Sequence, residues 1–159
     1  MMAGKRQLIL ARLDGERVSQ FSDIVAVDLE DRATIRREIE LRPSIRVEGS
    51  LSENVPRPVK NGRVSVRTLP NEPMSRTVQW VTWAPVSEDG SFVIDAWPQG
   101  ESLQMTALCD GYIATSGTVP DVVPENFAGG RFTWPQVFSP KSLSEPIVVE
   151  MMPLVRCEV

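Results

Sequence analysis

The chain has 159 residues, enough for a domain with a real core, and 42% hydrophobic and 24% charged residues, which is ordinary for a globular protein. Its net charge of −4 argues against nucleic acid or an anionic membrane as a partner, because both select a basic surface. It contains no histidine, which excludes Ser-His-Asp and Cys-His nucleophile systems and histidine-ligated zinc. No apolar run approaches the ~20 residues that span a bilayer. The apolar run near the N-terminus is too short for a signal peptide, so we expect neither a transmembrane segment nor a signal peptide in this sequence.

Thirteen prolines and ten glycines divide the chain into short alternating or β-branched runs, a pattern that predicts an all-β fold. In chain order, the predicted strands are 7–13, 23–29, 34–41, 44–51, 62–69, 77–86, 90–97, 102–109 and 146–152. Alternation is clearest in 62–69, where Val64 and Val66 share one face while Arg63, Ser65 and Arg67 share the other. This segment is therefore expected to be a half-buried strand, apolar side inward.

The segment 31–42 leaves a helical alternative open. Ile35, Ile39 and Arg42 follow a helical spacing there. No cap follows, however, and Pro43 ends the segment abruptly, which favours a strand.

Asp89-Gly90 is a strong hairpin signal, because glycine tolerates positive φ and aspartate bonds its own turn backbone. It predicts that 77–86 and 90–97 are antiparallel neighbours. A second turn at 97–100 then leads into 102–109, which predicts a meander of three strands.

Two parts of the chain resemble each other. Segments 7–22 and 103–117 align when Asp14-Gly15 is set on Asp110-Gly111, and 39–49 aligns with 149–159, matching Pro43 with Pro153. This similarity predicts a full unit at 44–153 that carries a loop insertion at 121–142. Residues 1–43 are then either strands of a preceding repeat or strands that pack onto the main domain, and 154–159 begin a following repeat.

The segments 45–68 and 87–112 resemble carboxypeptidase regulatory-like domains, in which a strand ending in glycine precedes a loop and a second β-branched strand, and a D-G-x-F-x-I-x-x-x-P-x-G-x-x-L-x-x-x-A-x-x-x-G-Y pattern follows. The resemblance covers about 44–119 and then 146–153. The matching positions are Asp89, Gly90, Phe92, Ile94, Pro98, Gly100, Leu103, Ala107, Gly111 and Tyr112. The resemblance implies a seven-stranded, transthyretin-like or immunoglobulin-like β-sandwich, here with extra N-terminal strands. It also implies a non-catalytic module, often repeated in tandem, in secreted or envelope proteins. The long 121–142 insertion departs from the family pattern.

The candidate binding residues are aromatic. Phe132, Trp134 and Phe138 lie in the insertion, where they suggest a platform for carbohydrate or peptide; the alternative is that they anchor a long loop on the sandwich. Trp80 and Trp83 are three residues apart and point to opposite faces of a regular strand, so at least one is expected in the core. Trp97 lies at a strand end, where aromatic side chains commonly cap a sandwich.

Cysteine and acidic residues are interpreted as structural. Cys109 and Cys157 are expected to be small buried hydrophobes, although a disulfide between them stays open. The acidic groups at 28–31 and 88–89 lack the spacing of a calcium loop, and the glycine-rich 128–131 lacks a phosphate-loop pattern.

The sequence thus predicts a non-catalytic module of a larger, extracytoplasmic protein, without a cofactor or metal, that spaces or contacts other domains or protein partners. The alternative is a polysaccharide- or peptide-binding module that uses the insertion.

Overall fold

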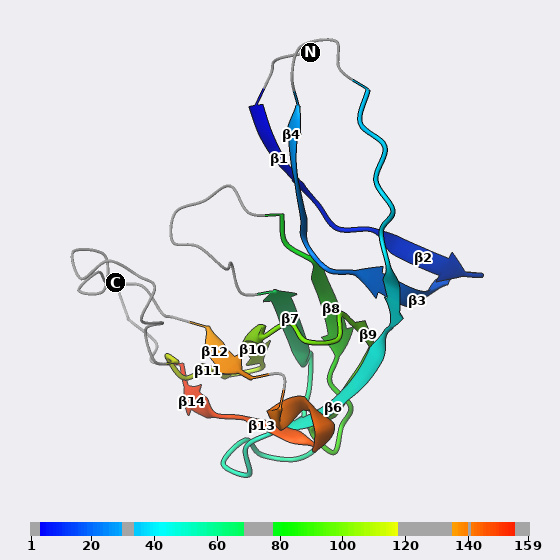
Figure 1. Cartoon of the computed structure of the whole chain (residues 1–159). Coiled ribbons are helices and arrows are strands. Elements are labelled where there is room, and N and C mark those ends of the chain that lie inside the picture. Colours follow the sequence, from blue (N-terminus) through cyan, green and yellow to red (C-terminus); the bar gives the residue numbers. More distant parts are fainter. Residues whose placement is uncertain (1–3, 30–33, 69–77, 118–134, 140, 155–159) are drawn as a thin grey trace, which may run out of the picture.

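The computed structural model describes residues 4–29, 34–68, 78–117, 135–139 and 141–154. Within these residues the protein is all-β, with one short 3₁₀ turn, η1 (Ser142–Ser144). No helix of the described part is long and apolar enough to span a bilayer. The strands form a sandwich-like body and an N-terminal arm (Figure 1).

The body consists of two sheets that face each other. A six-stranded sheet has the order β14-β11-β10-β7-β8, with β12 also beside β10. Its strands are β7 (Arg63–Thr68), β8 (Val81–Pro85), β10 (Leu103–Cys109), β11 (Tyr112–Ala114), β12 (Gln136–Phe138) and β14 (Met151–Pro153). The second sheet has the order β13-β6-β9 and comprises β6 (Ile45–Leu51), β9 (Ser91–Trp97) and β13 (Ile147–Val149), of which β13 runs parallel to β6. The β-sandwich-like architecture expected from the sequence is therefore present.

The core lies between these sheets and follows the predicted alternation. Val64 and Val66 of β7 are fully buried while the residues between and beside them are exposed. Trp97 is also fully buried, and its indole N–H donates to the Glu101 carbonyl at 3.1 Å. The buried cluster begins at Val47 and ends at Met151, so the body is built around residues of the predicted 44–153 unit.

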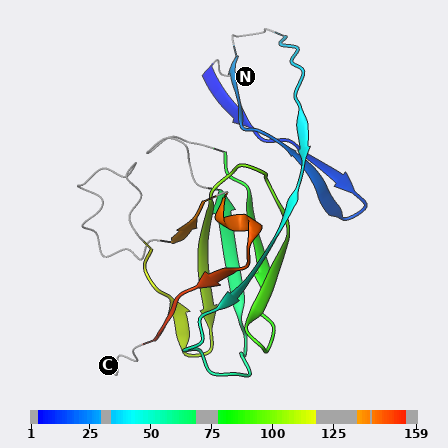
Figure 2. The same cartoon turned by 60° about the horizontal axis from the view of Figure 1, so that its bottom comes forward.

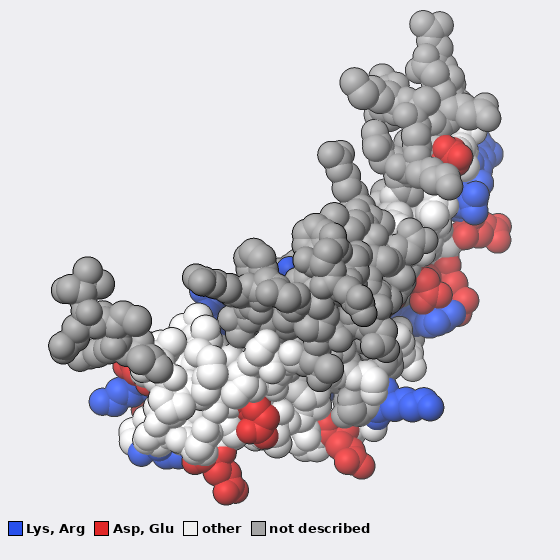
Figure 3. Space-filling model, turned by 90° about the vertical axis from the view of Figure 1, so that its left-hand side faces the viewer, with Lys and Arg blue, Asp and Glu red and all other residues white. Residues whose placement is uncertain are grey.

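The N-terminal arm contains two small sheets. The antiparallel pair of β1 (Gly4–Leu8) and β4 (Val25–Leu29) lies farthest from the body, and β2 (Ala11–Asp14), β3 (Arg17–Ser22) and β5 (Leu41–Pro43) form the second sheet in the order β2-β3-β5. Figure 2 shows the arm projecting from the body, and acidic and basic side chains lie along it in the side view (Figure 3). Its buried apolar residues, Phe21 and Val27, are not part of the core cluster.

The turn at Asp89-Gly90 is confirmed, but the predicted meander is wrong. Gly90 has a φ of 88°, its N–H donates to the Ser87 carbonyl at 2.9 Å, and Val86 and Phe92 form an antiparallel bridge. Beyond that bridge the strands separate, because β8 pairs with β7 whereas β9 pairs with β6 in the other sheet. The turn therefore carries the chain from one sheet to the other.

Other boundaries differ from the prediction because partners lie far away in sequence. The predicted strand 34–41 is strand only from Leu41, and the helix considered for 31–42 is absent from its described residues 34–42, where most side chains are exposed. The predicted 7–13 divides into β1 and β2, and β3, β11 and β12 were not predicted.

The predicted 146–152 also divides, into β13 and β14 of different sheets, at Glu150. There the Gln136 side chain pairs with the backbone, donating from Nε2 to the Glu150 carbonyl at 2.7 Å and accepting from the Glu150 N–H at 3.0 Å.

Candidate functional site

The predicted aromatic platform can be placed only in part. Phe138 is half-buried on β12 and packs against the core, while Phe132 and Trp134 lie outside the described residues. Trp97 is a core residue. Phe138 and Trp97 therefore have structural positions.

The thiol and acidic candidates also have structural positions where they are described. Cys109 is a buried free thiol whose pKa is raised by burial and by the nearby Asp110 carboxylate, and Cys157 lies outside the described residues. The Asp89 carboxylate accepts from the Ser91 hydroxyl at 2.7 Å and the Ser91 N–H at 2.9 Å, and these bonds lower its pKa. Asp89 thus stabilises its own turn. No group of three or more cysteine or acidic residues in the described part could hold a metal ion.

The arm meets the body at one aromatic contact. The Phe21 ring stands edge-on to Trp80, with ring centroids 4.8 Å apart and an interplanar angle of 72°. Phe21 is 2% exposed and Trp80 is half-buried, so the Phe21 side chain of β3 is buried where the arm meets the sandwich. Within the described structure the buried Trp80 Nε1 has no hydrogen-bond partner, so packing alone holds the indole.

Hydrogen bonds also join the arm to the start of the body, where the Gln7 side chain of β1 accepts from the Val78 N–H at 3.2 Å and Ser44 makes two bonds to β3. The Ser44 N–H donates to the Ser19 carbonyl at 2.9 Å, and the Ser44 hydroxyl donates to the Val18 carbonyl at 3.1 Å. Both bonds tie the residue after Pro43 to β3 just before the chain enters the body as β6. The junction thus fixes the direction in which β6 starts.

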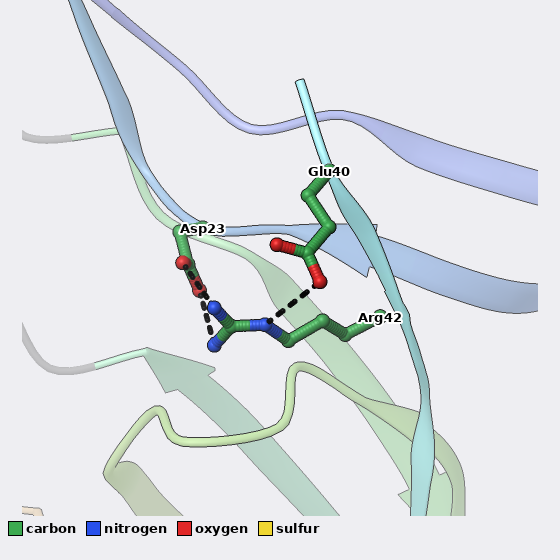
Figure 4. Close-up of polar contacts among 3 residues, drawn as sticks. All are labelled: Asp23, Glu40 and Arg42. Atoms are coloured by element: carbon green, nitrogen blue, oxygen red, sulfur yellow. Dashed lines mark hydrogen bonds and ion pairs between the residues drawn. The ribbon is translucent and has the colours of Figure 1, made fainter. Parts of the chain in front are cut away.

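An ion pair closes the arm near the same place (Figure 4). Arg42 at the end of the arm reaches Asp23, which follows β3, with Nη2 3.2 Å from Oδ2 and Nη1 3.3 Å from Oδ1. Glu40 lies 4.0 Å from the Arg42 Nε. All three side chains are largely exposed, so the pair contributes on the order of 0–1 kcal/mol.

The arm sheet β2-β3-β5 has a counterpart at the other end of the body, in β10-β11-β14. In both, a hairpin is followed by a third strand that ends in proline and pairs antiparallel with the second: Pro43 lies opposite Gln20, and Pro153 lies opposite Tyr112. The next residue makes the same bond in each case, since Leu154 N–H donates to the Gly111 carbonyl at 2.8 Å. Both hairpins turn through two residues, but the positive-φ glycine comes first in one (Gly15) and second in the other (Gly111), and the first hairpin is longer and contains a register shift at Arg12/Leu13.

The outward face of the six-stranded sheet is a second surface, which the sequence reasoning did not select. It presents Arg63 and Arg67 of β7 beside the exposed Trp83 of β8, with Arg63 Cζ 4.2 Å from the centroid of the Trp83 ring. The signal available in the sequence is the alternation of Arg63, Ser65 and Arg67 in 62–69, which marks an exposed polar face as well as a buried one.

Comparison with known proteins identifies no relative: no family model, no curated protein and no solved structure matches this chain. The resemblance to carboxypeptidase regulatory-like domains therefore rests on the matching positions from Asp89 to Tyr112 in the sequence.

Proposed function

We propose that this chain is a non-catalytic β-sandwich module of a larger, extracytoplasmic protein, and that it spaces other modules by contacting them at fixed geometry. The observation that carries the proposal is the recurrence of the β2-β3-β5 arrangement, including its final backbone bond, in β10-β11-β14. The extracytoplasmic setting and a transthyretin-like, seven-stranded origin of the sandwich follow from the resemblance to carboxypeptidase regulatory-like domains.

The recurrence supports a repeat because the residues that match in sequence also occupy equivalent positions in the two sheets. Pro43 and Pro153, aligned by sequence similarity alone, occupy the same place in their sheets. After Pro43 the chain enters a sandwich through Ser44, and Leu154 leaves β14 with the bond that Ser44 makes. A following sandwich would thus start from Leu154 in the direction that β6 takes from Ser44.

The docking contact follows from strand pairing, which sets Phe21 on Ile113, whereas the sequence alignment at Asp14-Gly15 would set Phe21 on Gly117. Ile113 of β11 lies opposite Met152 of β14, and Phe21 of β3 lies in the same way opposite Arg42 of β5. Phe21 is buried by Trp80 of the sandwich that follows it, whereas Ile113 is only half-buried and Met152 is 42% exposed. We infer that Ile113 receives the Trp80 equivalent of the next module, giving a stiff array rather than a flexible string.

A tandem chain tests this proposal. Residues 1–153 continue directly into a second copy of 44–159, so that Pro153-Ser44 reproduces the Pro43-Ser44 junction. We expect small-angle X-ray scattering to give one well-defined separation between the two sandwiches. The matched control carries a flexible Gly-Ser linker at the junction, and Ile113→Ser in the first copy should move the tandem chain toward that control. A direct fusion as flexible as the linker control would contradict the proposal.

The alternative, a carbohydrate- or peptide-binding module using the 121–142 insertion, now rests on Phe132 and Trp134, because Phe138 packs against the core. Titrating intrinsic tryptophan fluorescence with a neutral glycan and peptide panel tests it, with Trp134→Phe as the control variant. A binding signal that Trp134→Phe removes would favour this alternative.

A further inference from the structure

The outward face of the six-stranded sheet is an ordered side-chain platform. Antiparallel register aligns three strands across it. The rows are Val81, Arg67 and Gln104; Trp83, Ser65 and Thr106; and Pro85, Arg63 and Leu108. Trp83 is 56% exposed and Val81 is 60% exposed, so indole and aliphatic surface lie open beside the polar groups.

The charge of this platform is opposite to that of the chain. The six strands of the sheet contain Arg63 and Arg67 and no aspartate or glutamate, although the chain as a whole has 21 acidic residues against 17 basic ones. Within the described residues neither arginine is ion-paired with a carboxylate. The face is therefore a local cationic surface on an acidic protein.

Both guanidinium groups are held in place by uncharged neighbours. Arg63 stacks on the Trp83 ring at 4.2 Å, and the Arg67 Nε donates to Gln104 Oε1 at 2.8 Å. Gln104 is only 5% exposed, so it is a fixed support. The two guanidinium groups are therefore ordered but not neutralised. Their order lowers the entropy cost of binding an anion, and their positive charge stays available.

A hollow lies on the same face beside Arg67. Its volume is about 390 Å³, within the range of small-ligand sites. Besides Arg67, its polar lining consists of Ser65, Gln79, Gln104 and Thr106. Two hydroxyls and two amides thus surround one guanidinium, and a second guanidinium lies four residues away along β7, about 13 Å at strand spacing.

We propose that this face binds an acidic polysaccharide, with Arg67 and Arg63 pairing with carboxylates of two non-adjacent uronic acid units of one chain and the hydroxyls and amides contacting sugar hydroxyls. The N–H and C=O groups of the strands lie in the plane of the sheet and pair with neighbouring strands, so the face offers side chains only. A peptide backbone would find no strand partner there, whereas carboxylated, hydroxyl-rich sugars match the arginines, hydroxyls and amides of the face. The insertion contributes Pro135 to the lining of the hollow. The proposal does not depend on the repeat proposal.

The experiment uses the full chain and isothermal titration calorimetry. Oligomers of galacturonate, mannuronate-guluronate and glucuronate-containing chains are titrated at low and at physiological salt, beside fully methyl-esterified galacturonate oligomers and poly-glutamate of equal length. We expect binding of at least one uronate that weakens with salt, together with at least tenfold weaker binding of the ester and of poly-glutamate. Equal binding of the ester, equal or tighter binding of poly-glutamate, or no binding of any uronate would overturn the proposal.

Variants locate the site. Arg67→Gln and Arg63→Gln should each weaken uronate binding at least tenfold, because each removes one carboxylate contact. Arg46→Gln is the matched control, since Arg46 is an exposed arginine on β6 of the other sheet, paired with Glu48 at 3.3 Å. Thermal unfolding checks that all three variants stay folded. Equal losses in Arg46→Gln and Arg67→Gln would show non-specific attraction and refute the site.

Discussion

Substituting Gly90 by alanine tests how the turn at Asp89-Gly90 is held. Gly90 has a φ of 88°, and an added Cβ would come within 2.5 Å of the Arg57 Cζ and 2.7 Å of its Nε. The Arg57 guanidinium donates to three backbone carbonyls, those of Leu51, Val55 and Asp89. An alanine at 90 would therefore displace this side chain as well as strain its own backbone.

The magnitude has two parts. Holding alanine at positive φ costs about 1–2 kcal/mol. Losing three charge-assisted bonds on a partly exposed arginine costs about 2 kcal/mol in all, at the low end because water replaces some of them. We expect Gly90→Ala to lower the free energy of unfolding by about 3–4 kcal/mol and Arg57→Ala to lower it by about 2 kcal/mol.

Urea unfolding of the two single variants and the double variant measures these values. In the Arg57→Ala background only the backbone strain remains, so Gly90→Ala should cost about 1–2 kcal/mol there, a coupling of about 2 kcal/mol. Gly100→Ala is the matched control, because Gly100 has a φ of 90° and an added Cβ there meets nothing within 4 Å. Additive losses in the double variant, or equal costs at Gly90 and Gly100, would refute the proposed role of Arg57.

Three further predictions concern the arm and its junction. Deleting residues 1–42 should leave the sandwich folded and cost no more than about 1–2 kcal/mol in urea unfolding, because the core cluster begins at Val47; loss of cooperative unfolding would show that the arm strands are integral. Trp80→Phe should change stability by less than about 1 kcal/mol, because the indole N–H bonds nothing in the described structure, whereas Trp80→Ala should cost about 2–3 kcal/mol; similar costs for both would contradict a packing role. Burial, with a smaller contribution from the Asp23 charge, raises the pKa of Glu101 in the folded protein. As pH rises, the Glu101 carboxyl therefore ionises first in the unfolded chain, and the stability of the wild type falls relative to that of Glu101→Gln. Thermal melts should show no difference between them below about pH 3 and a more stable Gln variant above about pH 6, and the opposite sign would disprove the assignment.

Local signals in the sequence predicted what depends on a strand and its turn. Alternation in 62–69 identified the buried face of β7, and Asp89-Gly90 identified a turn that the structure contains. Neither signal states which strand lies on the other side, so the predicted meander was wrong although its strands exist. The short β11 and β12 depend on partners in β10 and β14, and no local pattern marks them.

The candidate sites likewise separate into features that the local sequence indicates and features that depend on distant strands. The proline alignment indicated two corresponding ends of the chain, yet the role of Phe21 emerged only from its contact with Trp80. The aromatic residues of the insertion are candidates by residue type alone, whereas Arg63 and Arg67 form a cationic surface because the strands on either side carry no acidic residue. That property belongs to the assembled sheet and requires knowing its strand order.

The pairing of Gln136 with Glu150 bears on how the long insertion is tolerated. The Gln136 amide bonds both backbone groups of Glu150, and the Thr115 N–H also donates to the Glu150 carbonyl at 2.8 Å, so the crossing point between the two sheets needs no particular side chain at 150. Gln136 lies just after the insertion's central part, so the chain can lengthen or shorten before it without disturbing the crossing. Variation among homologous modules should therefore accumulate upstream of a retained glutamine, much as variable segments of other scaffolds begin and end at fixed anchor residues.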